Sequence, residues 1–149
     1  GTPYDGGLEG TQHWDGGKWD LFSPGDPWTE VGPESLHPNG TNGVAEHWVV
    51  RRWRATELTA PTAVALTWHM RKGNTSNDGI TGILFVNGRQ ADYRTIAGND
   101  TVGVIRHIYT VLKPNDIVDL ALTPTGQDLL AHARAMGAAA DALHPGGPA

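Results

Sequence analysis

Apolar residues occupy every second position through the middle of the chain, which is the pattern of half-buried β-strands. The clearest case is residues 62–71, where Val64, Leu66, Trp68 and Met70 alternate with smaller or polar residues. Such a segment predicts a strand with one face turned to a hydrophobic core. We therefore expect Trp68 to be buried.

Residues 79–122 predict four short strands joined by three tight turns. Asn87-Gly88 is the pair that a two-residue type I′ hairpin prefers, because both central positions need a positive φ. The clusters at 97–100 and 113–116 are turn-forming in the same way. Strands at this spacing, with a turn signal in every gap, are typical of antiparallel sandwiches and barrels.

Two or three further strands are expected upstream, one or two of them short strands within residues 1–43. Residues 45–54 alternate in a way that places Trp48 in phase with aliphatic neighbours, so Trp48 is predicted to join the core. Residues 1–43 are rich in turn-forming residues, and their best strand candidate is 18–22. The rest of that region is expected to be ordered loop.

After Pro124 the period changes from strand-like to helical. Residues 127–143 are rich in alanine and leucine, and a narrow apolar stripe includes Leu129, Met136 and Leu143. A helix of this length with so narrow a stripe is marginal alone in water. We therefore expect these three residues to contact an open edge region of the sandwich or a neighbouring subunit.

The expected fold is all-β: an antiparallel two-sheet β-sandwich (jelly roll) of about eight strands with a C-terminal α-helix. The β-sandwich domain would span 1–126, with its best-defined strands in 44–122, and the helix and tail 127–149. At 149 residues the chain can close a core without staples, and it contains no cysteine to form them.

Charge and motifs exclude several functional classes. The net charge of −5 and the lack of a basic stripe argue against a nucleic-acid partner, and no apolar run approaches the roughly 20 residues that span a bilayer. No nucleophile elbow, paired-carboxylate motif or phosphate-binding loop is present. Glu46, Asp92 and Asp119 could act as acids, but carboxylates on sandwich strands are usually solvated or paired. The chain is thus predicted to be non-catalytic.

Three tryptophans in the loop-rich first part of the chain are the candidate binding residues: Trp14, Trp19 and Trp28. Exposed aromatic rings can stack on the apolar face of a sugar. Arg51 and His69 are expected to be polar partners on a sheet face. The alternative is that the three rings cap one end of the sandwich.

Metal and glycan signals are weak. The seven histidines show no metal-binding spacing, so no cofactor is expected. Calcium has oxygen-rich loop candidates in Asn74, Asp78, Asn99 and Asp100, which could equally be turns that bond their own backbone. Glycosylation sequons begin at Asn39, Asn74 and Asn99, all in predicted surface loops.

Four short motifs follow one another along the chain: HWVVRRW at 47–53, VNG at 86–88, TIAGNDT at 95–101 and NDIVDLAL at 115–122. In that order they resemble an accessory β-sandwich module of large secreted and cell-surface proteins of planctomycetes and related environmental bacteria. The resemblance covers about residues 44–122. It departs from the family at the end, where a closing strand is replaced by the predicted helix.

The resemblance implies a secreted or cell-surface location and a non-catalytic module similar to carbohydrate-binding jelly rolls. The expected partner is then a glycan. The missing closing strand favours a second class, a structural or assembly subunit of a surface layer, fibre or larger complex, whose partners are neighbouring protein subunits. A small hydrolase or lyase on the same fold is a third class that no motif supports.

Overall fold

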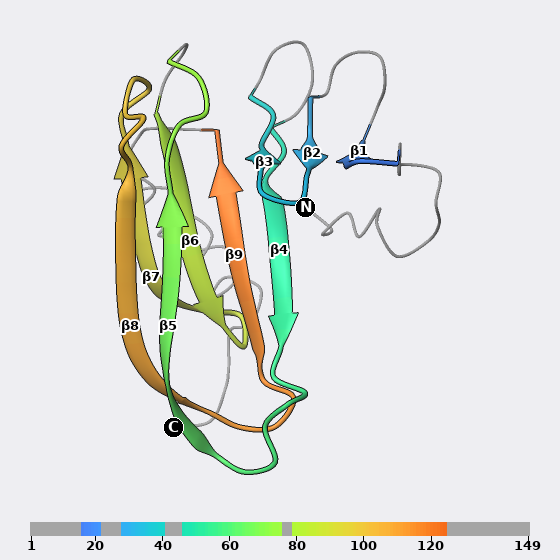
Figure 1. Cartoon of the computed structure of the whole chain (residues 1–149), viewed down its shortest axis with the longest axis vertical. Coiled ribbons are helices and arrows are strands. Elements are labelled where there is room, and N and C mark those ends of the chain that lie inside the picture. Colours follow the sequence, from blue (N-terminus) through green and yellow to red (C-terminus); the bar gives the residue numbers. More distant parts are fainter. Residues whose placement is uncertain (1–15, 22–27, 41–45, 76–78, 125–149) are drawn as a thin grey trace, which may run out of the picture.

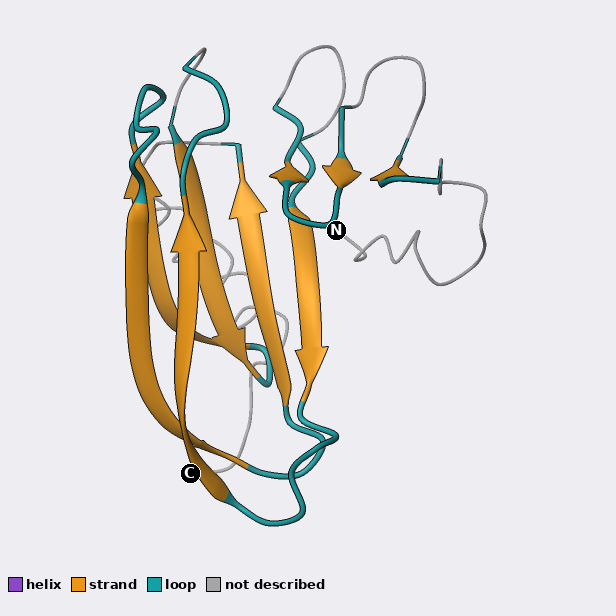
Figure 2. Cartoon of the chain, in the orientation of Figure 1, coloured by secondary structure: helices purple, strands orange, loops and turns teal. Residues whose placement is uncertain are grey.

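The computed structural model of the chain describes residues 16–21, 28–40, 46–75 and 79–124 (Figure 1). Within these ranges all regular structure is strand, as Figure 2 shows. The strands are β1 (Trp19–Asp20), β2 (Glu30–Val31), β3 (Leu36–His37), β4 (Val49–Arg54), β5 (Thr62–Met70), β6 (Ile80–Val86), β7 (Arg89–Ile96), β8 (Val104–Leu112) and β9 (Ile117–Thr123). The predicted helix and tail at 127–149 lie outside the described residues.

The strands form three antiparallel sheets. A four-stranded sheet has the order β4-β9-β6-β7, a two-stranded sheet pairs β5 with β8, and a small sheet has the order β1-β2-β3. Figure 1 shows β5 and β8 in front of β6 and β7, with β9 and β4 to one side and the small sheet beside β4. The all-β, antiparallel class predicted from the sequence is thus confirmed.

The β6–β7 connection has the predicted turn. Asn87 has φ +50° and Gly88 has φ +77°, as a type I′ turn requires. The Asn87 side chain also fixes the neighbouring strand, because its Oδ1 accepts a 2.9 Å hydrogen bond from the backbone N–H of Ile117. The turn therefore sets the register of the hairpin and ties it to the start of β9.

In the other two predicted turns an aspartate side chain adds a bond to a nearby backbone N–H. Asp116 accepts a 2.8 Å hydrogen bond from the backbone N–H of Lys113, and Asn115 between them has φ +69°. Asp100 accepts a 2.7 Å bond from the backbone N–H of Gly103. The backbone also closes both turns, because the N–H of Asp116 donates to the Lys113 carbonyl and the N–H of Asp100 to the Ala97 carbonyl, each at 3.1 Å.

The core lies between the four-stranded sheet and β5–β8. Its buried members are Trp68, Met70, Leu84, Ile96, Leu112 and Val118. The predicted burial of Trp68 is confirmed, and its indole packs on Gly82 of β6. This contact joins the two sheets, between which no backbone ladder runs in the described chain.

The predicted burial of Trp48 is wrong. Trp48 precedes β4 and is only half-buried, and its Nε1 donates a 2.6 Å hydrogen bond to Glu46. Val49, one residue later, is the buried position, so the inward face of β4 carries the odd-numbered residues. The alternation of 45–54 predicted the inward face to carry the even-numbered residues, which is the wrong face. One tryptophan lies at an even position and one at an odd position, so the pattern fits either assignment.

Candidate functional site

The outer face of the two-stranded sheet is the candidate binding surface. Its inward residues enter the core at every second position, so the intervening residues point outward. The strand register places these outward residues in four cross-strand pairs, which we call the β5–β8 outer face: Ala63–Val111, Ala65–Tyr109, Thr67–His107 and His69–Ile105.

The bulky residues of the β5–β8 outer face are strongly exposed. Tyr109 is 83% exposed, Ile105 64% and Val111 60%. Across from Tyr109 and Val111, strand β5 carries only alanines. The phenol ring therefore lies beside small side chains, with no large side chain directly opposite it.

The polar groups of this face are neutral hydrogen-bonding side chains. Thr67 Oγ1 and His107 Nδ1 share a 2.9 Å hydrogen bond across the two strands. His69 is exposed and lies opposite Ile105. None of the eight residues is Asp, Glu, Lys or Arg, so the face has no formal charge when its histidines are neutral.

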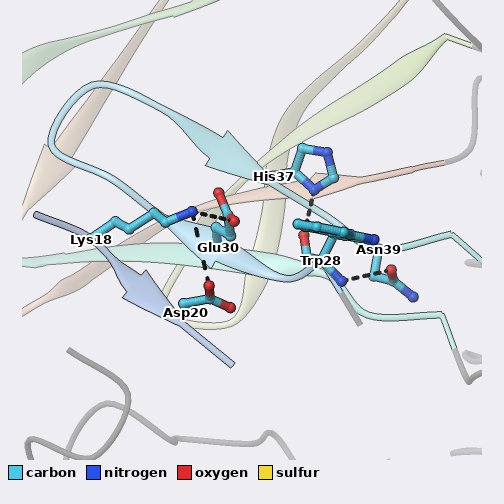
Figure 3. Close-up of polar contacts among 6 residues, drawn as sticks. All are labelled: Lys18, Asp20, Trp28, Glu30, His37 and Asn39. Atoms are coloured by element: carbon cyan, nitrogen blue, oxygen red, sulfur yellow. Dashed lines mark hydrogen bonds and ion pairs between the residues drawn. The ribbon is translucent and has the colours of Figure 1, made fainter. Parts of the chain in front are cut away.

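The predicted tryptophans lie elsewhere. Trp19 is half-buried in β1, Trp28 is 49% exposed and immediately precedes the loop into β2, and Trp14 lies outside the described residues. Figure 3 shows how this region is held together: the Trp28 carbonyl accepts from His37 Nδ1, and its N–H donates 3.0 Å to Asn39 Oδ1. Trp28 is thus a ring on an anchored backbone.

Lys18 adds ionic links to the same region. Its Nζ bonds Glu30 of β2 and lies 3.9 Å from Asp20 of β1 (Figure 3). These contacts connect strands of only two residues each, which have little backbone pairing of their own. They make the small sheet a defined support for Trp28.

The structure does not bring Arg51 and His69 onto one surface. Arg51 pairs with Leu120 on the inward face of the four-stranded sheet, whereas His69 lies on the β5–β8 outer face. The Arg51 guanidinium donates to the backbone carbonyls of Gly32 and Pro33, at 2.5 and 3.0 Å. Its bonds therefore fasten the small sheet to β4.

The carboxylates considered as acids are all engaged by other side chains. Asp92 accepts a 3.1 Å bond from Trp68 Nε1 and two bonds from Arg106, at 2.8 and 3.1 Å. The bond with Arg106 is the largest cause that lowers the pKa of Asp92, so the group stays ionised. This is the signature of a structural ion pair.

The same holds at the other two positions. Asp119 accepts two 2.8 Å bonds from Arg52, and these bonds raise the pKa of the guanidinium. Glu46 accepts from Trp48. Arg52 and Asp119 thus form an ion pair across β4 and β9.

No group of three or more metal-binding side chains occurs in the described ranges. Among the calcium candidates, Asp100 binds the backbone of Gly103, Asn74 and Asn99 are exposed, and Asp78 lies outside the described residues. Calcium binding stays a prediction.

One sequon is not on the surface. Asn39 is buried, its Oδ1 accepts from Trp28 and its Nδ2 donates to the Gly40 carbonyl at 2.5 Å. The amide nitrogen is thus occupied where a glycan would have to be attached, so the prediction of a surface loop is wrong for Asn39. Asn74 and Asn99 are exposed as predicted.

Sequence reasoning missed Tyr109. Residues 104–112 are apolar at most positions, so their own pattern does not say which face is outward. Only the pairing with β5, whose alternation is clean, assigns Tyr109 to the outside. The predicted interaction residues Leu129, Met136 and Leu143 lie beyond the described part of the chain.

The described residues contain no helix long and apolar enough to cross a membrane. No protein-family model, curated protein or solved structure matches the chain. The family resemblance of the motifs therefore remains an expectation, and the argument for function comes from the geometry of the β5–β8 outer face.

Proposed function

We propose that this chain is a non-catalytic β-sandwich module of the jelly-roll type that binds a neutral glycan on its β5–β8 outer face. The observation that carries the proposal is Tyr109, an aromatic ring 83% exposed in the middle of the β5–β8 outer face, which contains no Asp, Glu, Lys or Arg. A ring that stays in water on a folded domain has apolar area available for a ligand.

The surroundings of the ring fit a sugar. The faces of pyranose rings carry C–H groups that pack on an aromatic ring, and their rims carry hydroxyls that need hydrogen-bond partners. Thr67, His69 and His107 supply such partners on the same face. The absence of formal charge among these eight residues favours neutral over acidic glycans.

The proposed site is flat and carries a single aromatic residue, which predicts weak binding of short oligosaccharides. A dissociation constant near 1 mM, about −4 kcal/mol, is expected for such a ligand. Long or insoluble chains should be retained better, because several modules or several contacts can act together. A secreted or cell-surface location is part of the same proposal and rests on the motif resemblance.

The test is retention by polysaccharides. The purified chain is mixed with microcrystalline cellulose, chitin and a soluble neutral β-glucan, with alginate as the acidic comparison. Tyr109→Ala should reduce retention on a neutral polysaccharide at least about tenfold, as expected for loss of a stacking contact. Val102→Ala, which removes an 85% exposed residue from a loop outside this face, is the matched control.

The outcomes separate two surfaces. Loss of binding in Trp28→Ala with normal binding in Tyr109→Ala would move the site to Trp28, one of the three tryptophans that the sequence analysis named. Folded protein that is retained by none of the neutral polysaccharides would overturn the glycan proposal.

A second candidate function is assembly through the same face. Ile105 and Val111 are aliphatic and strongly exposed on the same face as Tyr109. Exposed apolar side chains that lie together often mark a protein interface. In that case sedimentation should show association that increases with concentration. Val111→Lys should abolish the association, whereas Val102→Lys should leave it unchanged.

A further inference from the structure

The centre of the four-stranded sheet is buried also on the side that faces away from the core. The register pairs Ile83 with Ala121 and Thr81 with Thr123, and these residues alternate with Gly82 and Leu84, which face Trp68 and the core. Even so, Thr81 and Thr123 are fully buried, Ala121 is 1% exposed and Ile83 is 3% exposed. We call these four residues the far-face centre.

Among the strands described, β5 and β8 are the ones packed face to face with this sheet, and they lie on its other side (Figure 1). The sequences of the two central strands agree with burial on both sides. β6 reads ITGILFV and β9 reads IVDLALT, nearly continuous apolar runs of the kind found in strands covered on both faces. Strand β5, by contrast, is exposed at every outward position.

The exposed fractions of residues across the sheet show how wide a segment must be to bury its centre. Val50, Ala121, Ile83 and Tyr93 form one outward row across β4, β9, β6 and β7. The two edge residues are 49% and 38% exposed, whereas the two central ones are almost completely buried. The cover is therefore about two strands wide, roughly 10 Å, which is the diameter of one helix.

We propose that residues 127–143 are this cover: a helix whose stripe of Leu129, Met136 and Leu143 packs on the far-face centre. The chain leaves β9 at Thr123-Pro124, beside the far-face centre itself, and residues 125–149 follow. A helix over 127–143 is about 26 Å long. Strand β6, with seven residues, is about 23 Å long, so the two lengths match.

The composition of the segment supports the same occupant. Apart from its stripe, half of its residues are alanine, whose small side chain allows a helix to approach a sheet closely, and it contains no Val, Ile, Phe, Tyr or Trp to favour a strand. Residues 1–15 fit less well. They are glycine-rich, show no apolar period and lead into β1, which belongs to the small sheet.

The lack of cysteine in the chain allows a direct test. A single thiol is introduced by Ala121→Cys, and its reaction with a thiol reagent is timed in the full chain and in a chain ending at Gly126. The thiol should react at least about tenfold faster in the shorter chain, because covered thiols react only when the cover opens. Val111→Cys, on the exposed β5–β8 outer face, should react equally fast in both.

Point variants test the stripe without truncation. In the full chain with Ala121→Cys, the pair Leu129→Asp and Met136→Asp should release the thiol and reduce the helical circular dichroism signal. Ala138→Asp lies on the opposite side of the helix, about 160° from Met136 at 100° per residue, and should leave protection intact. Ile83→Cys replaces Ala121→Cys if the latter does not fold.

Two results would overturn the proposal. A thiol at 121 that stays protected after both truncation and stripe substitution means that another part of the chain covers the far face. Protection that disappears on dilution of the full chain means that a second copy supplies the cover. Either result leaves the glycan proposal untouched, because that proposal concerns the opposite side of the molecule.

Discussion

Gly82 of β6 lies directly beneath the indole ring of Trp68 on β5. A Cβ atom at position 82 would be 2.7 Å from Cζ3 of that ring and 3.0 Å from Sδ of Met70. The glycine is thus required by the approach of two sheets and not by backbone conformation. Replacing it tests how tightly the two sheets are packed.

Gly82→Ala should destabilise the fold by about 1–3 kcal/mol, because neither the ring nor the strand can move without disturbing the core. Gly73→Ala is the matched control, since nothing lies within 4 Å of a Cβ built there. Urea unfolding measures both. Equal stability of the two variants would show that the sheets are farther apart than described.

Trp68 contributes both volume and a hydrogen bond. Trp68→Ala should lower the free energy of unfolding by about 3–5 kcal/mol through the cavity it leaves. Trp68→Phe keeps most of the ring area but removes the Nε1 donor to Asp92, so a smaller loss, about 1–3 kcal/mol, is expected. Chemical denaturation of the two variants checks the order, and the reverse order would contradict it.

Asp92 should make stability depend on pH. Its pKa is lowered in the folded chain, mainly by the bond from Arg106, so the unfolded chain binds a proton at a higher pH than the folded one. The stabilisation is therefore present above the ordinary aspartate pKa of about 3.9 and is lost as the pH falls through the lower folded-state value.

The measurement compares Asp92→Asn with the natural chain from pH 7 down to about pH 3. The variant should be less stable at pH 7, and the difference should shrink as the pH falls. Asp116, whose pKa is also lowered, remains in both proteins and accounts for part of the pH dependence of stability in each of them. A difference that is constant over this range would show that the charge of Asp92 has no role.

Asn87 should be sensitive to substitution although it is exposed. Asn87→Ala removes the acceptor for Ile117 and places a residue less suited to positive φ, so a loss of about 1–2 kcal/mol is expected. Asn87→Asp keeps an acceptor and should lose less. Thermal unfolding distinguishes them, and an unchanged melting temperature for Asn87→Ala would contradict the role of the turn.

The local features of the fold could be predicted because each rests on a local cause. Asn87-Gly88 specifies its turn by positive φ, and the alternation of 62–71 specifies the burial of Trp68. The face of β4 could not be predicted, because tryptophans fall on both of its phases. In the small sheet, β1 lies within the predicted strand at 18–22, but β2 and β3 were not located, since strands of two residues have no period to detect.

The candidate site was harder to predict than the fold. The exposure of Tyr109 depends on which strand lies beside β8, and that pairing joins residues about forty positions apart. The contacts of Arg51 could not be predicted for the same reason, because its carbonyl partners at Gly32 and Pro33 belong to the small sheet. Sequence alone gives residue types, but contacts between distant segments decide which of them remain available to a ligand.

The pairing of β4 with β9 has a consequence for how the chain folds. Val49 is opposite Leu122 and Arg54 is opposite Ile117, so the edge of the four-stranded sheet cannot close until almost all of the described chain has been synthesised. The β6–β7 hairpin, whose strands are joined by two residues, can form much earlier. Domains dominated by distant pairings fold on the millisecond-to-second scale, about a thousandfold or more slower than helical bundles. During synthesis β4 must therefore wait, without its partner, until β9 has left the ribosome.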